Sequence, residues 1–317
     1  MRIVVLTGGI GGARFLVGVR AHARRIGADV TAVVNVGDDV RMHGLQICPD
    51  LDSVMYTLGG AADPERGWGR VGETWVVKEE LTKYGVEPSW FGLGDKDTAT
   101  HLVRTTMLHA GYPLSQVTAA LCERWQPGMT LLPATDDRLE THVVVDVEGE
   151  RKAIHFQEWW VRYRGKVPTH RFVFVGAEAA KPAAGVAEAL SSADVVLVAP
   201  SNPVVSIAPI LAVPSLREAV VNGPAPVVGV SPIIGGAPVR GMADLCLTTL
   251  GVEVSAAGVG GLYGARAQDG LLDGWLVDTA DSGVEVPGVR TQAVPLWMTD
   301  EDATAAMVAA ALELAGK

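Results

Sequence analysis

The feature that most constrains the fold of this chain is a repeated order of short apolar run, glycine-rich turn and helical segment. Residues 3–7 form a β-branched run that ends in GGIGG at positions 8–12, and residues 14–25 follow with helical spacing. Residues 30–36 form a second apolar run, which ends in GDD at positions 37–39. Continuous apolar strands that alternate with helices are typical of a parallel sheet buried on both faces. We therefore expect an α/β fold, with a Rossmann-like, mostly parallel sheet and helices on both faces.

The middle of the chain departs from this alternation. Residues 60–128 are mainly helical in pattern, so we expect a largely helical insertion there, with helices near 74–84, 98–108 and 114–124. Further helices are expected at 51–58, from 203 onward, at 239–250 and at 301–315. Strands are expected at 130–132, 142–147, 153–156, 194–199, 226–230 and 252–255, with an antiparallel pair across Glu148-Gly149. Because no repeat or low-complexity linker divides the chain, we treat residues 1–317 as one domain.

Composition excludes several functional classes. The formal net charge is −10, from 26 basic and 36 acidic residues, which argues against a broad nucleic-acid surface. The three cysteines have no CxxC spacing, so neither a disulfide framework nor a zinc knuckle is indicated. The first apolar run is too short for a signal peptide, and no window approaches the roughly 18 apolar residues of a membrane span. We expect a cytoplasmic protein that binds neither nucleic acid nor membrane.

The glycine turn after the first strand predicts a phosphate site. Glycines let backbone N–H groups approach a ligand closely, and the following helix N-terminus adds partial positive charge. Gly9, Gly11, Gly12 and Arg14 are the candidate contacts, and a tight turn without a ligand is the alternative. Arg14 occupies the third glycine position of the dinucleotide fingerprint, and the second strand ends in Asn35 rather than a carboxylate. These departures disfavour NAD, and the absence of a GxxxxGK[ST] motif disfavours a Walker-type NTPase.

Four aspartates follow the second strand and open the next helix. Asp38 and Asp39 end the strand, and Asp50 and Asp52 belong to PDLD at positions 49–52. Mg²⁺ prefers carboxylate oxygens and commonly bridges protein to phosphate. Helix capping explains Asp50 or Asp52 taken singly. Because all four lie beside a phosphate turn, we predict a metal or catalytic role for at least one of them.

Three further clusters carry polar chemistry. Asp97, His101 and Arg104 share one helical face, which a capped, solvated helix start explains equally well. HFQEWW at 155–160 contains adjacent tryptophans, which serve as core anchors or stack on a flat ligand. Ser201-Asn202-Pro203 follows an expected strand, where a capped helix start can also bind an anion. Gly235 lies in a third strand-end loop, so these loops favour a ligand with a nucleotide end and a separate reacting end.

Taken together, these segments resemble the 2-phospho-lactate transferase family of deazaflavin coenzyme (factor 420) biosynthesis. The matching strings run along nearly the whole chain and are closest to the mycobacterial-type phosphoenolpyruvyl transferase branch. They are GGIGGAR at 8–14, NVGDD at 35–39, PDLD at 49–52, LGDKDTATHLVR at 93–104, HFQEWW at 155–160, PSNPVVSI at 200–207 and SPIIGGAPV at 231–239. Related regulatory proteins that bind uridine-diphospho-sugars share the glycine turn without this chemistry.

The resemblance implies a specific reaction. A phosphoenolpyruvyl or 2-phospholactyl group would move from a guanosine diphosphate-linked three-carbon acid to the terminal ribityl hydroxyl of the deazaflavin Fo, and GMP would leave. The sequence does not choose between the two acids, although the enolpyruvyl donor is expected in the mycobacterial-type branch. The family uses Mg²⁺. Archaeal members carry a basic deazaflavin contact just before LGD, where this chain has Gly92.

These expectations assign roles to particular residues. Asp39 and Asp50 are the predicted metal ligands, and Asp52 is placed on the acceptor hydroxyl; all three are the predicted catalytic residues. The donor phosphates are assigned to Gly9, Gly11, Gly12, Arg14, Ser201, Asn202 and Gly235. The acceptor is assigned to Asp52, Asp97, His101 and Trp159, with the helical insertion forming part of its site. We also expect a homodimer. Two hypotheses compete with the transferase: a non-catalytic sensor of a nucleotide or sugar-nucleotide, and a dinucleotide oxidoreductase.

Overall fold

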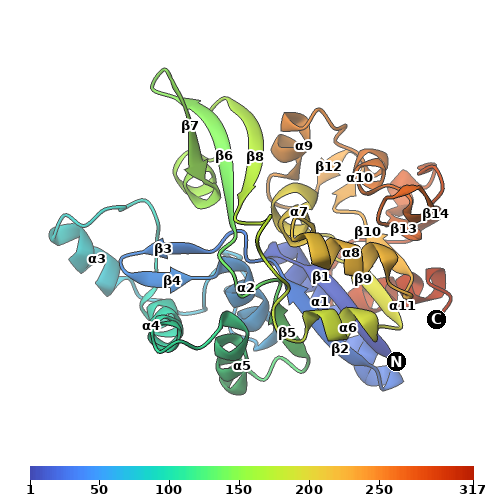
Figure 1. Ribbon diagram of the computed structural model, residues 1–317, viewed down its shortest axis with the longest axis horizontal. Helices are drawn as coiled ribbons and strands as arrows, with labels where there is room; N and C mark the ends of the chain where they lie inside the picture. The colour runs from blue at the N-terminus through green and yellow to red at the C-terminus, as the bar shows by residue number, and fades with distance from the viewer.

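The computed structural model describes all residues, 1–317, and is built on one seven-stranded sheet (Figure 1). Every neighbouring pair in this sheet is parallel, in the order β14-β13-β10-β9-β1-β2-β5. The strands are β1 (Arg2–Thr7), β2 (Asp29–Val34), β5 (Thr130–Pro133), β9 (Val195–Val198), β10 (Val227–Val230), β13 (Gly274–Val277) and β14 (Arg290–Ala293). The predicted α/β, Rossmann-like parallel sheet is thus confirmed.

The strand order reverses at the centre of this sheet. From β1 the chain proceeds to β2 and β5 on one side, and it later returns to β9, β10, β13 and β14 on the other. The crevice at such a reversal, beyond the carboxyl ends of the strands, is where open α/β sheets bind ligands. The loops after β1 and β9, at residues 8–12 and 199–202, flank this crevice.

Helices cover the sheet in two groups. The helices α1 (Gly9–Ile26), α2 (Pro49–Leu58) and α11 (Glu301–Leu314) pack together, and α6 (Val186–Ser191), α7 (Ala208–Leu211) and α8 (Pro214–Asn222) form a second group. Right-handed crossovers on either side of β1 place the two groups on opposite faces. The strands β9, β10 and β13 are buried along their whole length, as expected for a sheet covered on both faces.

Two smaller units project from this core (Figure 1). One holds the hairpin β3 (Val40–Met42) and β4 (Leu45–Ile47), together with α3 (Val76–Lys83), α4 (Asp95–His109) and α5 (Leu114–Trp125). The other is a three-stranded antiparallel sheet of β6 (Glu140–Val147), β7 (Glu150–His155) and β8 (Thr169–Val175). The predicted turn Glu148-Gly149 joins β6 to β7, with both residues at positive φ, as a tight hairpin requires.

Some sequence predictions fail near the C-terminal end. Residues 252–255 are not a strand, because Ser255 accepts a hydrogen bond from the Gly258 amide and caps α10 (Ala256–Tyr263). The helix expected at 239–250 is only α9 (Ala243–Thr249), after the short strands β11 (Ile233–Ile234) and β12 (Ala237–Pro238).

No single helix is long and apolar enough to cross a membrane. Only the bent pair of helical segments Pro203–Leu211 and Pro214–Asn222 is long and apolar enough when the two are taken together.

Candidate active site

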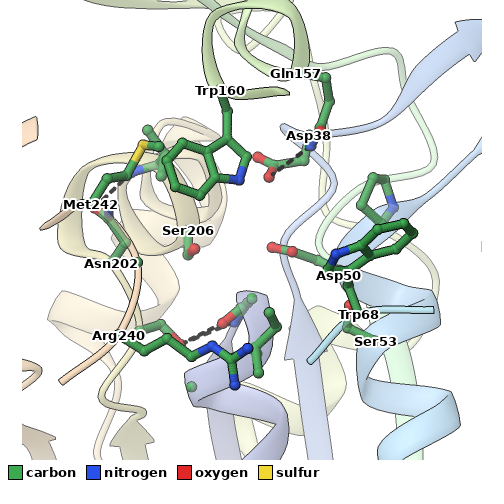
Figure 2. Close-up of a pocket in the computed structure, with 18 of the residues that line it drawn as sticks. Asp38, Asp50, Ser53, Trp68, Gln157, Trp160, Asn202, Ser206, Arg240 and Met242 are labelled. Carbon is green, nitrogen blue, oxygen red and sulfur yellow. Dashed lines mark hydrogen bonds between the residues drawn. The ribbon is translucent and has the colours of Figure 1, made fainter. Parts of the chain in front are cut away.

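One large cavity, of about 1060 Å³, opens at the reversal of strand order. Its walls come from the loops after β1 and β9, the start of α2, the segment around α3, and the 239–243 loop. Figure 2 shows Asp38 and Asp50 directed into this space, with Trp160 and Trp68 on opposite sides in that view. The cavity therefore joins the phosphate turn, the acidic residues and an aromatic wall.

The turn after β1 exposes backbone amides to the cavity. Gly8, Gly9, Gly11 and Arg14 line it, and α1 has neither a side-chain cap nor an acidic residue in its first turn. Gly9 requires glycine because its φ is 64°, and a Cβ on Gly11 would lie 2.9 Å from the Pro200 carbonyl oxygen. An uncapped helix N-terminus of this kind favours an anionic ligand.

Two buried carboxylates share one amide donor beside this turn. Asn35 Nδ2 donates to Asp38 Oδ1 at 3.2 Å and to Asp50 Oδ2 at 2.9 Å. Burial raises the pKa of Asp50 to about 6, while the hydrogen bonds from Asn35 and Gly9 act in the opposite direction. Burial and the neighbouring Asp50 charge raise the pKa of Asp38 well above its usual value. The paired carboxylates thus lack a cation close enough to balance them.

This electrostatic imbalance fits a divalent cation. Asp38 and Asp50 both line the cavity, and both are less than a tenth exposed. Burial raises the pKa of both carboxylates, and the Asp50 charge raises that of Asp38 further; a nearby metal ion would stabilise their charged forms. Asp38 and Asp50 are therefore the residues that suit Mg²⁺.

The pKa of Asp50 predicts a pH dependence of stability. Its folded pKa lies above its unfolded value, so the native state binds the extra proton between about pH 4 and 6. Without metal, ionisation of Asp50 should therefore cost stability as the pH rises through 6. Relative to Asp50→Asn, the wild type should lose about 2 kcal/mol of unfolding free energy between pH 4 and 7, measured by urea titration with EDTA. Parallel pH curves for the two proteins would contradict this.

Comparison with known proteins identifies the family. The model of the family described as "2-phospho-L-lactate transferase CofD" matches residues 3–311. The chain belongs to the CofD family. It is therefore a transferase of deazaflavin coenzyme (factor 420) biosynthesis.

Individual relatives agree with this membership. A "Phosphoenolpyruvate transferase" of Mycolicibacterium smegmatis is 62% identical and is aligned over 100% of this chain and 99% of its own length. Proteins of the same name from Nocardia farcinica and Mycobacterium tuberculosis are 64% and 59% identical, over 99% and 100% of this chain and 95% and 99% of theirs. A solved Bacillus halodurans protein of the UPF0052 family has the same fold, with a TM-score of 0.61 at 17% identity, covering 98% of this chain and 99% of that one.

In this CofD-family chain, Asp38 rather than Asp39 faces the cavity. The Asp39 backbone oxygen lies 3.1 Å from His155 Nε2, and its side chain is hydrogen-bonded to Cys48, away from the lining. Both aspartates lie in the turn between β2 and β3, and of the two only Asp38 lines the cavity. The structure therefore brings Asp38, and not the predicted Asp39, to the cavity.

Asp52 lines the cavity but is committed to Arg104. Both terminal guanidinium nitrogens of Arg104 donate to its carboxylate, Nη1 to Oδ2 at 3.1 Å and Nη2 to Oδ1. Arg104 is only 1% exposed, so this is a buried, bidentate ion pair. Asp52 is therefore held rigidly and has little capacity left to bind a metal.

The predicted acceptor residues Asp97 and His101 also line the cavity, as parts of one hydrogen-bond network. Tyr56 donates to Asp97 Oδ1 at 2.6 Å, and His101 Nε2 lies 3.3 Å from Asp97 Oδ2. Arg104 Nη1 lies 3.1 Å from His101 Nδ1 and can only donate, so Nδ1 accepts and Nε2 carries the proton. Although Asp52, Asp97 and His101 lie within metal-binding distance of one another, Arg104 already supplies their cation.

Trp159 and Trp160 have opposite environments. Trp159 is fully buried, and its Nε1 donates to Thr169 Oγ1 at 2.9 Å. It does not line the cavity, so the structure does not bring Trp159 to the predicted acceptor site. Trp160, which is 39% exposed, lines the cavity instead. The remaining aromatic lining consists of Tyr56, Trp68, Trp75, Trp90, Phe91 and Phe156.

Of the other predicted phosphate contacts, some line the cavity and the others lie outside it. Ser201 and Asn202 line the cavity, but Ser201 Oγ donates to the Gly8 oxygen, and Asn202 Oδ1 accepts from the amides of Val204 and Val205. These two side chains therefore chiefly shape the two loops. Gly12 and Gly235 do not line the cavity. A Cβ on Gly12 would strike Thr7 and Ser201, and the Gly235 amide donates to Asp281, so the structure brings neither predicted contact to the cavity.

Sequence reasoning did not single out Asn35 or Gln157 as site residues. Asn35 holds the carboxylates of Asp38 and Asp50, and Gln157 Nε2 lies 3.4 Å from Asp38 Oδ2 (Figure 2). Both residues lie within the motifs NVGDD and HFQEWW, but in the sequence Asn35 indicates only that the usual ribose-binding carboxylate is missing. A buried amide at a strand end, next to two aspartates, is the signal that could have found it.

Proposed function

We propose that this chain transfers a phosphoenolpyruvyl or 2-phospholactyl group from a guanosine diphosphate-linked donor to the ribityl hydroxyl of Fo, with release of GMP. The hydroxyl oxygen would form a bond to the phosphorus that carries the three-carbon acid. The bond from that phosphorus to the bridging oxygen would break, GMP would leave with the electron pair, and the hydroxyl proton would be released to solvent. The names of the relatives favour the phosphoenolpyruvyl donor.

The observation that carries this proposal is the two-ended character of the large cavity. Its amide-lined turn suits a diphosphate, and its aromatic wall suits a flat ring. The buried carboxylates Asp38 and Asp50 lie on the turn side, and Tyr56, Asp97 and His101 lie on the side of the helical insertion. A volume of about 1060 Å³ is at the upper end for small-molecule sites, which accords with two substrates bound together.

We propose that Asp38 and Asp50 hold Mg²⁺ in this site. When bound, the metal would stabilise the charge that develops on the transferred phosphoryl group. Asn35 orients both carboxylates, and the amides of the glycine turn supply further positive potential to the donor. Asp52, fixed by Arg104, is suited to orienting the acceptor rather than to accepting its proton.

The direct test is to incubate the protein with Fo, each guanosine diphosphate-linked acid in turn, and Mg²⁺. We expect GMP release and a deazaflavin product whose mass identifies the acid transferred. Addition of EDTA should abolish turnover. Binding of the nucleotide without any GMP release would instead favour the non-catalytic sensor.

The two adjacent tryptophans provide a prediction with an internal control. Trp160→Ala should raise the KM for Fo about tenfold, because a stacking surface at the cavity is lost, and should leave stability nearly unchanged. Trp159→Ala should instead destabilise the fold by about 3–5 kcal/mol, because it empties a fully buried site. Steady-state kinetics and urea unfolding of both variants would test this, and equal effects on KM would contradict it.

A further inference from the structure

A lysine ammonium lies in the aromatic part of the cavity. Lys78, on α3, lines the cavity, and its Nζ lies 5.9 Å from the centroid of the Trp75 ring. A Cβ built on Gly92 would lie 3.6 Å from that Nζ, 3.5 Å from Trp75 and 3.9 Å from Trp68. The ammonium group of Lys78 therefore occupies the space beside Gly92.

This ammonium group has no anionic partner. Lys78 forms no ion pair and its Nζ makes no hydrogen bond, whereas Lys83, on the same helix, pairs with Glu80 at 2.6 Å. The neighbouring Arg66 also lies over Trp68 and Trp75, but its guanidinium is bound to Asp63 and to the Arg70 oxygen. Of these two cations, Lys78 is the one that forms no ion pair.

We propose that Lys78 is an acceptor-binding residue, whose ammonium donates a hydrogen bond to an oxygen on the edge of the acceptor's flat ring. This inference rests on the proposed function, in which that ring is the riboflavin-like deazaflavin of Fo. Trp68 and Trp75 offer the apolar surface beside the ammonium, and a riboflavin-like ring carries carbonyl oxygens along one edge. A hydrogen bond from a charged donor also fixes the orientation of such a ring.

The surroundings of Gly92 allow a lysine at this position to replace the positive charge of Lys78. Gly92 has an ordinary negative-φ backbone, and the neighbours of an added Cβ are at normal van der Waals distance. Glycine is therefore not required at this position by conformation or by space. A lysine at 92 would start next to the present Nζ of Lys78 and could bring an ammonium into the same part of the cavity.

The experiment measures Fo binding to the full chain by isothermal titration calorimetry, for the wild type, Lys78→Met, Lys83→Met and Lys78→Met/Gly92→Lys. We expect Lys78→Met to weaken Fo binding about 10- to 100-fold, Lys83→Met to bind as the wild type, and the double variant to recover most of the loss. The KM for the donor should be unchanged in all of them.

Several outcomes would overturn the proposal. One is wild-type affinity for Fo in Lys78→Met, and another is an equal loss in Lys83→Met. A loss in Lys78→Met without recovery in the double variant would assign the effect to the packing of the lysine stem on Trp75 instead. Failure of the wild type itself to bind Fo would contradict the proposed function, so the two failures are distinguishable.

Discussion

Asp50→Asn should lower kcat about 100- to 1000-fold and leave the protein folded. The substitution keeps the side-chain oxygen that accepts from Asn35 but removes the charge that, with Asp38, suits a divalent cation next to the glycine turn. Steady-state kinetics at saturating Mg²⁺ and both substrates would measure the effect. Because a buried, incompletely balanced charge is removed, the melting temperature without metal should not fall.

Asp146→Asn is the matched control for this prediction. Asp146 is a half-exposed carboxylate on β6 that pairs with Arg151 and His170. It lies outside the cavity lining, so its kcat should remain within about twofold of the wild type. Near-normal turnover in Asp50→Asn, or an equal loss in Asp146→Asn, would remove Asp50 from the catalytic machinery.

Arg104→Met should destabilise the fold by about 3–5 kcal/mol. The Asp52 side chain is 6% exposed, and removing Arg104 leaves its carboxylate buried without its bidentate partner. The same arginine also donates to His101 and lies 3.4 Å from the Gln46 oxygen, so its loss disturbs the whole network around Asp97. The unfolding free energy from urea titration gives the direct measurement.

Two further variants test whether the lost stability comes from the buried Asp52–Arg104 ion pair or from the loss of any arginine charge. The double variant Asp52→Leu/Arg104→Met should recover much of the lost stability, because no unpaired buried charge remains. Arg151→Met breaks an exposed pair with Asp146 and should cost less than about 1 kcal/mol. If Arg104→Met cost as little as Arg151→Met, the buried pair would not have the role assigned to it.

The membership of one family and the class of fold could be predicted from local patterns. The sequence predicts the strands at 3–7 and 30–36 and the glycine turn between strand and helix. Each of these signals depends only on residues that are neighbours in the chain. The hairpin at Glu148-Gly149 is a similar local signal. The expected Mg²⁺, both substrates and the homodimer stay predictions, since neither the fold nor the comparisons tests them.

What only the tertiary structure decided is which members of each motif reach the cavity. The sequence determined that acids, glycines and adjacent tryptophans follow particular strands, because strand, turn and helix signals are short-range. It could not choose Asp38 over Asp39 or Trp160 over Trp159, since neighbouring side chains differ only in direction. Nor could it bring Lys78 beside Gly92, because that proximity depends on how α3 folds back over the segment before α4.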